Sequence, residues 1–229
     1  MPRISVVIPC LNEAAICVPR LNALQPLREA GHELILVDAG SDDDTLAIAA
    51  PLVDLALTSV PGRAVQMNRG AAAATADVFW FVHLDTQLPE GAARQLLQQI
   101  REGAGWGRFD VRLSGGRPMF RVIERAMNLR SRLTGMVTGD QALFVRRDFF
   151  ERVGGFPSIA LMEDLAISER LKGLASPACL RGPVVTSSRR WERDGVWRTV
   201  AQMWFLRGAY FLGADPKWLA RRYYPDESE

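Results

Sequence analysis

A carboxylate and an imidazole, Asp85 and His83, stand at the end of an apolar run over residues 79–82. Consecutive β-branched and aromatic residues predict a strand that is buried on both faces of an α/β sheet. Because α/β proteins bind ligands at the carboxyl ends of such strands, we expect Asp85 and His83 to lie beside a metal ion or a phosphate-bearing ligand. The alternative for Asp85 is capping of a helix that begins near Glu90, and this stretch alone does not decide between the two.

Polar side chains also follow two other predicted strands. Asn12 and Glu13 come after the apolar run at residues 4–9, and Asp38 comes after the run at residues 33–37. Helix capping would explain such residues without any ligand. Neighbouring parallel strands, however, place their carboxyl ends on one edge of the sheet. The coincidence at three strands therefore favours a shared binding site.

An arginine, Arg63, begins a predicted helix over residues 63–76, and Asn68 lies further along the same helix. Positive charge at a helix start opposes the helix dipole, so Arg63 is poorly explained as a helix stabiliser. We interpret it as a contact to a bound anion or to the edge of a base. The alternative is a solvated surface arginine.

Two more charged groups occur in the second half of the chain. Glu163 and Asp164 follow a glycine-rich stretch, where paired acids stabilise a helix start and an aspartate can also serve as a general base. Arg190 and Trp191 belong to a cluster of guanidinium groups beside an aromatic ring. Arginine suits bidentate contact with phosphate, although a solvated basic patch is the alternative.

The spacing of apolar residues and of helix and turn signals predicts the elements that position these side chains. We expect strands at residues 4–9, 33–37, 55–60, 78–84, 106–113, 141–145 and 178–186, and helices at 13–30 (irregular because of Pro19 and Pro26), 46–50, 63–76, 93–102, 119–133, 165–174, 196–212 and around Trp218. This alternation predicts an α/β fold with a mostly parallel sheet and helices on both faces.

Composition and missing motifs exclude several classes of protein. The three cysteines form no CxxC pair, which argues against a disulfide framework or structural zinc and for a reducing compartment, so we expect a cytoplasmic protein. No signal-peptide pattern opens the chain, and no apolar run approaches the ~20 residues that cross a bilayer. The net charge of +2 is too small to indicate nucleic acid as a partner. The absence of GxGxxG, GxxxxGK[ST] and GxSxG argues against dinucleotide enzymes, P-loop ATPases and common α/β-hydrolases.

An aromatic pattern marks the helix expected at residues 196–212. Trp197, Trp204 and Phe211 recur at heptad spacing, which gives a broad apolar stripe. We expect this stripe to be buried in the domain or between the subunits of a homodimer. Its aromatic and arginine content also suits a membrane surface.

Taken together, these residues resemble the family 2 glycosyltransferases, which have the GT-A fold and use nucleotide-sugar donors. The matching segments, in the family's order, are residues 5–13, 37–45, 63–70, 83–85, 139–141, 163–164 and 189–191. They extend over nearly the whole chain, and the ordered series is far more specific than any single segment. The resemblance implies one domain over residues 1–229, with a nucleotide-sugar-binding half at 1–115 and an acceptor-binding and catalytic half at 116–229.

The resemblance also implies a role for each matching residue. Asp85 would be the last carboxylate of the metal-binding DXD element and would hold Mn²⁺ or Mg²⁺ on the donor diphosphate. Asp164, with Glu163 beside it in the ED motif, would be the catalytic base. The donor, a UDP-sugar in our expectation, would contact Pro9, Asn12, Glu13, Asp38, Arg63, Asn68, His83, Arg190 and Trp191.

One residue departs from the family pattern, because His83 stands where the DXD element usually has an aspartate. With an ordinary imidazole pKa near 6.5, protonation of His83 should weaken metal-dependent donor binding below about pH 6. The sequence around these motifs resembles one bacterial subgroup of small transferases associated with radical-SAM, selenium and arsenosugar gene sets.

The implied reaction is a single displacement at the anomeric carbon, with a metal on the leaving diphosphate and a base on the opposite side, and it predicts inversion. The alternatives are a nucleotidyltransferase and a non-catalytic nucleotide-sugar-binding protein. A nucleotidyltransferase needs a glycine-rich loop after the first strand, and this chain has none there. Retention of Asp85 and Asp164 argues against a non-catalytic binding protein. No residue pattern identifies the sugar or the acceptor.

Overall fold

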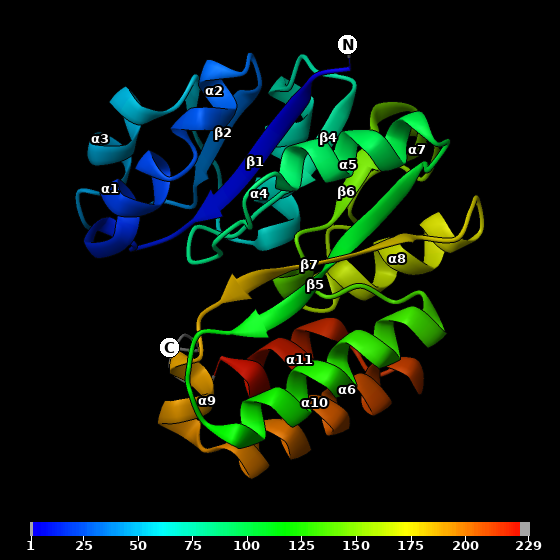
Figure 1. Ribbon diagram of the computed structural model, residues 1–229. Helices are drawn as coiled ribbons and strands as arrows, with labels where there is room; N and C mark the ends of the chain where they lie inside the picture. Colours follow the sequence, from blue (N-terminus) through cyan, green and yellow to red (C-terminus); the bar gives the residue numbers. More distant parts are fainter. Residues whose placement is uncertain (1, 225–229) are drawn as a thin grey trace.

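The computed structural model describes residues 2–224, which form a seven-stranded sheet flanked by helices (Figure 1). The strands are β1 (Ile4–Cys10), β2 (Glu33–Asp38), β3 (Leu55–Thr58), β4 (Val78–Phe81), β5 (Trp106–Leu113), β6 (Phe144–Arg146) and β7 (Ala178–Thr186). Their order in the sheet is β3-β2-β1-β4-β6-β5-β7. Strand β6 is antiparallel to both of its neighbours, and the other pairings between these strands are parallel. The prediction of an α/β fold with a mostly parallel sheet is confirmed.

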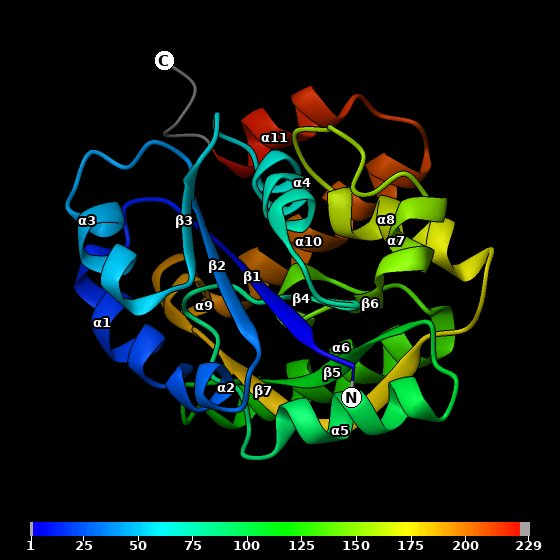
Figure 2. The same ribbon diagram turned by 90° about the horizontal axis from the view of Figure 1, so that it is seen from above.

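Helices cover both faces of the sheet. They are α1 (Ala14–Asn22), α2 (Gln25–Glu29), α3 (Thr45–Ala49), α4 (Arg63–Ala73), α5 (Ala92–Arg101), α6 (Pro118–Thr134), α7 (Arg147–Arg152), α8 (Glu163–Lys172), α9 (Arg189–Asp194), α10 (Val196–Phe211) and α11 (Pro216–Tyr223), with 3-10 turns η1 (Ala50–Leu52) and η2 (Gly139–Gln141). Because successive side chains of a strand point to opposite faces, Val6 and Ile8 of β1 pack with α1, α3 and α5, whereas Val7 packs with α4, α7 and α8. Figure 2 shows these two layers from above.

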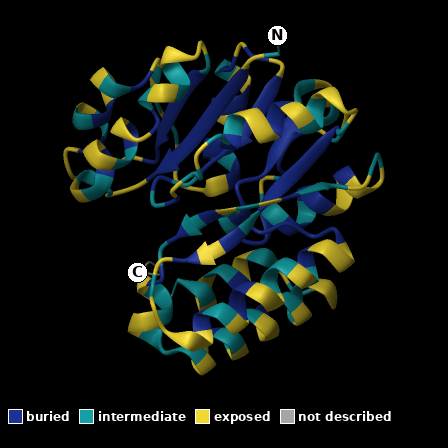
Figure 3. Cartoon of the chain, in the orientation of Figure 1, coloured by how far each residue is buried: buried dark blue, intermediate teal, exposed yellow. Residues whose placement is uncertain are grey.

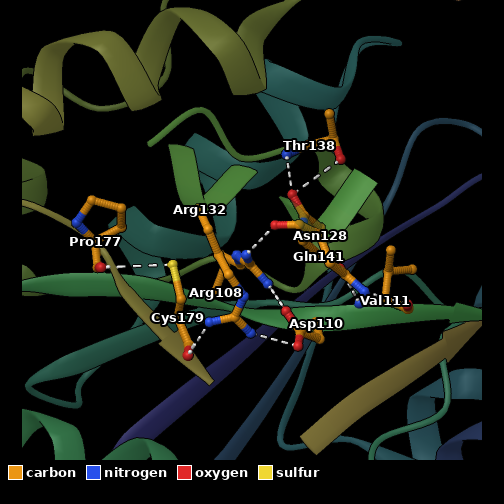
Figure 4. A network of polar contacts seen from close by, with 9 residues as sticks. All are labelled: Arg108, Asp110, Val111, Asn128, Arg132, Thr138, Gln141, Pro177 and Cys179. Carbon is orange, nitrogen blue, oxygen red and sulfur yellow. Dashed lines mark hydrogen bonds and ion pairs between the residues drawn. The ribbon is translucent and has the colours of Figure 1, made fainter. Parts of the chain in front are cut away.

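Helices α6, α10 and α11 form a further layer next to β5 and β7 (Figure 1). A polar network fixes α6 against β5 (Figure 4). The fully buried Arg108 forms an ion pair with Asp110 and donates to the carbonyl oxygen of Asn128 at 3.0 Å. Asp110 also accepts from Arg132 of α6 at 2.5 Å. The Asn128 amide bonds both backbone polar atoms of Val111, at the point where the pairing of β5 with β7 shifts register.

Two differences from the expected elements have simple physical reasons. The strand expected over residues 78–84 ends at Phe81, although Val82 and Leu84 are buried. An apolar run reports burial and does not distinguish a paired strand from a buried turn. Asp85 therefore lies in a loop beyond β4. Helices α7 and α9 were not expected, because six residues are too few to display a helical period.

The expected burial of the C-terminal stripe is wrong within this chain. Trp197, Trp204 and Phe211 are 71%, 75% and 59% exposed, and the buried residues of α10 are Thr199 and Leu206. In Figure 3 exposed and partly buried residues alternate along this helical layer. Heptad spacing places the three rings on one face of α10, but no element within residues 2–224 covers that face.

Candidate active site

The ends of β1 and β2 are joined by side-chain hydrogen bonds. Asp38, buried at the end of β2, accepts from the backbone N–H groups of Gly40 and Ser41 at 3.0 and 2.8 Å. The Ser41 hydroxyl in turn accepts from the backbone N–H of Asn12 at 2.8 Å. These bonds hold the turns after the two strands together on the carboxyl edge of the sheet, where the sequence predicts a site.

Seven titratable side chains gather at this edge, and each either exerts or feels an electrostatic effect within the group. We call them the site cluster: Glu13, Arg63, His83, Asp85, Asp140, Glu163 and Asp164. They come from the loops after β1 and β4, from η2, and from the first residues of α4 and α8. Six of the seven were among the predicted site residues. Asp140 was not, although it lies in the matching segment at 139–141.

His83 is held in its neutral form. Its ring packs so closely on Gly139 that a Cβ at residue 139 would lie 2.8 Å from His83 Cε1. Burial, together with the positive charge of Arg63, lowers the pKa of His83 to about 3. The low pKa keeps the imidazole neutral at pH 6 and so argues against the predicted loss of metal-dependent binding through its protonation near that pH, and the binding itself stays a prediction.

The predicted catalytic carboxylates begin α8. Met162, just before them, has a left-handed φ of 71°, which costs about 1–2 kcal/mol for a residue with a side chain. Asp164 accepts from the backbone N–H of Gly139 at 2.9 Å and from that of Leu165 at 2.8 Å, so both carboxylate oxygens have fixed positions. Glu163 is buried, and its burial next to Asp164 raises the pKa of its carboxyl.

Asp85 fits a metal ion that is shared with a phosphate ligand. Its side chain is partly exposed and faces Arg189 across 4.0 Å. Burial and then the charge of Asp85 raise the pKa of nearby Glu13 to about 7. Among residues 2–224 no three His, Cys, Asp or Glu side chains are placed to hold a metal ion by themselves. Mg²⁺ in proteins is commonly held by one or two carboxylates plus phosphate oxygens of the substrate, and Asp85 with Asp140 or Glu13 matches that arrangement.

Two of the residues predicted to contact the donor are occupied within the protein. Pro9 is buried within β1. The Asn68 amide donates to the carbonyl oxygen of Phe156 at 2.8 Å and accepts from its N–H at 3.0 Å. These bonds tie α4 to the glycine-rich stretch before α8, which accounts for Asn68 without a ligand.

Arg190 packs on α11, and Trp191 packs on β5 and α6. The Arg190 guanidinium stacks over the Tyr223 ring, with 3.8 Å from Cζ to the ring centroid. Trp191 packs beside Leu113, Phe120 and Ile123. Tyr223 acts electrostatically on Arg63, so the ring that carries Arg190 lies near the site cluster. Donor contacts from Arg190 and Trp191 stay predictions.

Two hollows on the surface, with volumes of about 300 and 480 Å³, lie outside the site cluster. The first is lined by β5, α6 and β7, and the second by residues 214–221.

Known proteins share both the sequence pattern and the fold. The family model described as glycosyl transferase family 2 matches residues 5–154. A Mycobacterium tuberculosis protein named as an uncharacterized glycosyltransferase is 30% identical over 102 residues, which are 44% of this chain and 45% of the relative. This chain therefore matches less than half the length of that relative.

Solved structures share the fold at low sequence identity. TarS of S. aureus has a TM-score of 0.67 and 18% identity, covering 81% of this chain and 36% of TarS. The mannosyltransferase PcManGT of Pyrobaculum calidifontis has a TM-score of 0.65 and 20% identity, and the match covers 91% of this chain and 61% of PcManGT. Glucosyl-3-phosphoglycerate synthase of Mycobacterium tuberculosis has a TM-score of 0.65 and 22% identity, and the match covers 93% of this chain and 79% of the synthase. These likenesses show that the fold is GT-A. Because the family model covers well over half of the chain, the protein belongs to glycosyl transferase family 2.

Proposed function

We propose that this protein transfers a sugar from a nucleoside-diphosphate donor to an acceptor hydroxyl, with a divalent cation and with inversion at the anomeric carbon. The observation that carries the proposal is the position of Asp164. Its carboxylate is fixed by two backbone N–H groups at 2.9 and 2.8 Å and lies within electrostatic reach of Asp140, which in turn interacts with Arg63 and Asp85. A base and an anion-binding group thus share one edge of the sheet.

The residues divide the chemistry between them. The Asp164 carboxylate accepts the proton of the acceptor hydroxyl while that oxygen bonds to the anomeric carbon and the bond to the diphosphate breaks. Asp85, with Asp140 or Glu13, would hold Mn²⁺ or Mg²⁺, which when bound neutralises charge on the leaving diphosphate. Arg63, exposed at the start of α4, would bind the same diphosphate or the base. Glu163, buried beside Asp164, would position the base.

Structures with the same fold support the choice of donor. TarS has been solved with UDP-GlcNAc, glucosyl-3-phosphoglycerate synthase with Mn²⁺ and UDP-glucose, and PcManGT with Mn²⁺ and GDP-mannose. We therefore propose a UDP-sugar first and a GDP-sugar second. The cytoplasmic location and membership of the small bacterial subgroup named above belong to the same proposal.

A screen of UDP- and GDP-sugars by thermal shift, with and without Mn²⁺, tests donor binding. A ligand at one hundred times its dissociation constant stabilises the native state by about 2.7 kcal/mol, which is easily measured. Turnover is then followed as release of nucleoside diphosphate. Release of pyrophosphate would show a nucleotidyltransferase instead. Donor binding without turnover over a broad acceptor panel would show a non-catalytic binding protein.

A further inference from the structure

The proposed function leaves a large exposed apolar surface without a role. We call it the aromatic face, and it consists of Trp197, Trp204, Phe205, Phe211 and Leu212 in and just after α10, with Trp218 of α11. The rings of Phe205 and Trp218 lie 6.1 Å apart, so the two helices contribute to one surface. A contiguous apolar surface of this kind on a soluble protein marks an interaction site.

The outer side of α10 is apolar along its whole length. Residues 197, 201, 204, 208 and 211 fall on one helical stripe, are all exposed, and are Trp, Ala, Trp, Gly and Phe. Arg198 and Arg207 are the charged residues of α10, which has no Asp or Glu. Charge therefore flanks the stripe and does not interrupt it.

The charge that surrounds the aromatic face is strongly positive. Helices α10 and α11, which carry the aromatic face, contain five arginine or lysine residues and no acidic residue, and Asp215 caps the start of α11. The whole chain has a net charge of only +2, so these two helices carry more positive charge than the complete protein. Arg222 stacks over the Trp218 ring at 4.5 Å, which places a cation directly on the edge of the face.

This combination argues against two other partners. A second copy would bring the same positive layer against itself in a two-fold dimer, and like charges across an interface oppose association. Single-stranded nucleic acid is bound by cations that follow its backbone among the stacking rings. The stripe of α10 carries no such interleaved cations.

We propose that the aromatic face docks the protein on the surface of an anionic phospholipid bilayer. Tryptophan and phenylalanine rings enter the region between headgroups and acyl chains, while arginine and lysine remain at the phosphates. Each basic residue near an anionic surface contributes about 1 kcal/mol, which is about a fivefold gain in affinity. Within residues 2–224 no helix is long and apolar enough to cross a bilayer, so the proposed contact is with its surface.

A hollow beside the aromatic face suits a lipid headgroup. It has a volume of about 480 Å³ and is lined by Ala214, Asp215, Lys217, Trp218 and Arg221. The lining carries two cations and one carboxylate, so its net charge is +1, and a phosphodiester headgroup would contact Lys217 and Arg221 beside the indole ring. The hollow adds a specific polar contact to the apolar one.

The opposite side of α10 supports the candidate active site. Leu206, fully buried on that side, packs with Met162 and Leu165, which flank the two catalytic carboxylates. A docked protein would thus have the bilayer on one side of α10 and the start of α8 on the other. The proposal does not depend on the reaction, because it rests on surface residues outside the site cluster.

Co-sedimentation with vesicles tests the proposal directly. The purified full chain should bind vesicles that contain phosphatidylglycerol, bind phosphatidylcholine vesicles much more weakly, and lose affinity as salt is added. Trp197→Ser and Trp204→Ser should each weaken binding at least about tenfold, and Lys217→Gln with Arg221→Gln should reduce the salt dependence. Val18→Ser, at an exposed apolar residue of α1, is the matched control and should bind as the wild type does. Thermal melts establish that every variant is folded, as expected for substitutions at exposed positions.

Four results would overturn the proposal. The first is no binding to phosphatidylglycerol vesicles by the folded protein, and the second is binding that both tryptophan variants retain in full. The third is a dimer in sedimentation equilibrium that the tryptophan variants abolish, because the face would then be a subunit interface. Binding of a single-stranded oligonucleotide in preference to vesicles would likewise assign the face to another partner.

Discussion

Replacement of Asp164 by asparagine separates catalysis from binding. Both oxygens of this carboxylate accept backbone N–H groups, from Gly139 at 2.9 Å and from Leu165 at 2.8 Å. Asparagine keeps the shape but has a single acceptor oxygen, so one of the two N–H groups would face the amide NH₂. A partly buried donor without a partner costs about 1–3 kcal/mol, so Asp164→Asn should lower the free energy of unfolding by that amount and remain folded.

The effect on turnover should be larger than the effect on stability. Loss of a general base lowers a rate by about 10²–10⁴-fold, which is roughly 3–5 kcal/mol of activation free energy. Asp164→Asn should therefore reduce turnover at least about a hundredfold. Its donor affinity should stay within a few-fold of the wild type, because the cation and the diphosphate are assigned to Asp85 and Arg63.

Calorimetric titration of the donor, run beside a turnover assay, measures both quantities. Asp85→Asn is expected to show the opposite pattern, with weaker Mn²⁺-dependent donor binding. Asp148→Asn makes the same chemical change at an exposed carboxylate outside the site cluster and should change neither quantity. If Asp164→Asn turns over at the wild-type rate, or if it abolishes donor binding, the assignment of Asp164 as the base is wrong. Loss of turnover in Glu163→Gln alone would move that role to Glu163.

Three further predictions concern stability. A Cβ at Gly70 of α4 would lie 2.4 Å from Val7 Cγ1, so Gly70→Val should lower the denaturant midpoint by the equivalent of about 1–3 kcal/mol. Asp110→Ala would leave the fully buried guanidinium of Arg108 without its carboxylate and should lower the free energy of unfolding in urea by about 3–5 kcal/mol. Burial raises the pKa of Glu163 from 4.5 to about 7. The contribution of this side chain to the free energy of unfolding is therefore complete below pH 4.5 and is lost as the pH rises through 7. Stability should fall over that interval by at most about 3 kcal/mol, and Glu163→Gln should flatten the profile in pH-dependent melts.

Elements with clear periodicity were predictable from the sequence. The alternating pattern of residues 106–113 and the run at 178–186 predict β5 and β7 with the bounds that the structure shows. The second half of β5 does have one more exposed face, but both faces of its first four residues are buried, so there the polar positions are filled by the buried Arg108 and by Gly107. The apolar run of 79–82 carries no such contrast, so it predicted a longer strand than β4. The short helices α7 and α9 depend on packing and have no local period.

Part of the candidate site was predictable because chain order and strand ends fix it. Asp38, Asp85 and Asn12 lie at the carboxyl edge as parallel strands require. Asp140 was missed as a site residue, since its proximity to Arg63 arises from tertiary packing of η2. The pKa of His83 could not be read from the sequence for the same reason, because burial and Arg63 together set it.

The C-terminal helix shows what residue spacing and average charge leave out. Heptad spacing correctly places Trp197, Trp204 and Phe211 on one side of α10, but spacing states which residues share a face and not what covers that face. A net charge of +2 likewise conceals two helices, α10 and α11, that contain five basic residues and no acidic residue. Partner recognition depends on the local field and on the local apolar area, and both are properties of the folded surface. An average near neutrality is therefore compatible with a surface that binds an anionic partner, and the proposed surface lies on the outer side of α10, whose inner side packs against the start of α8.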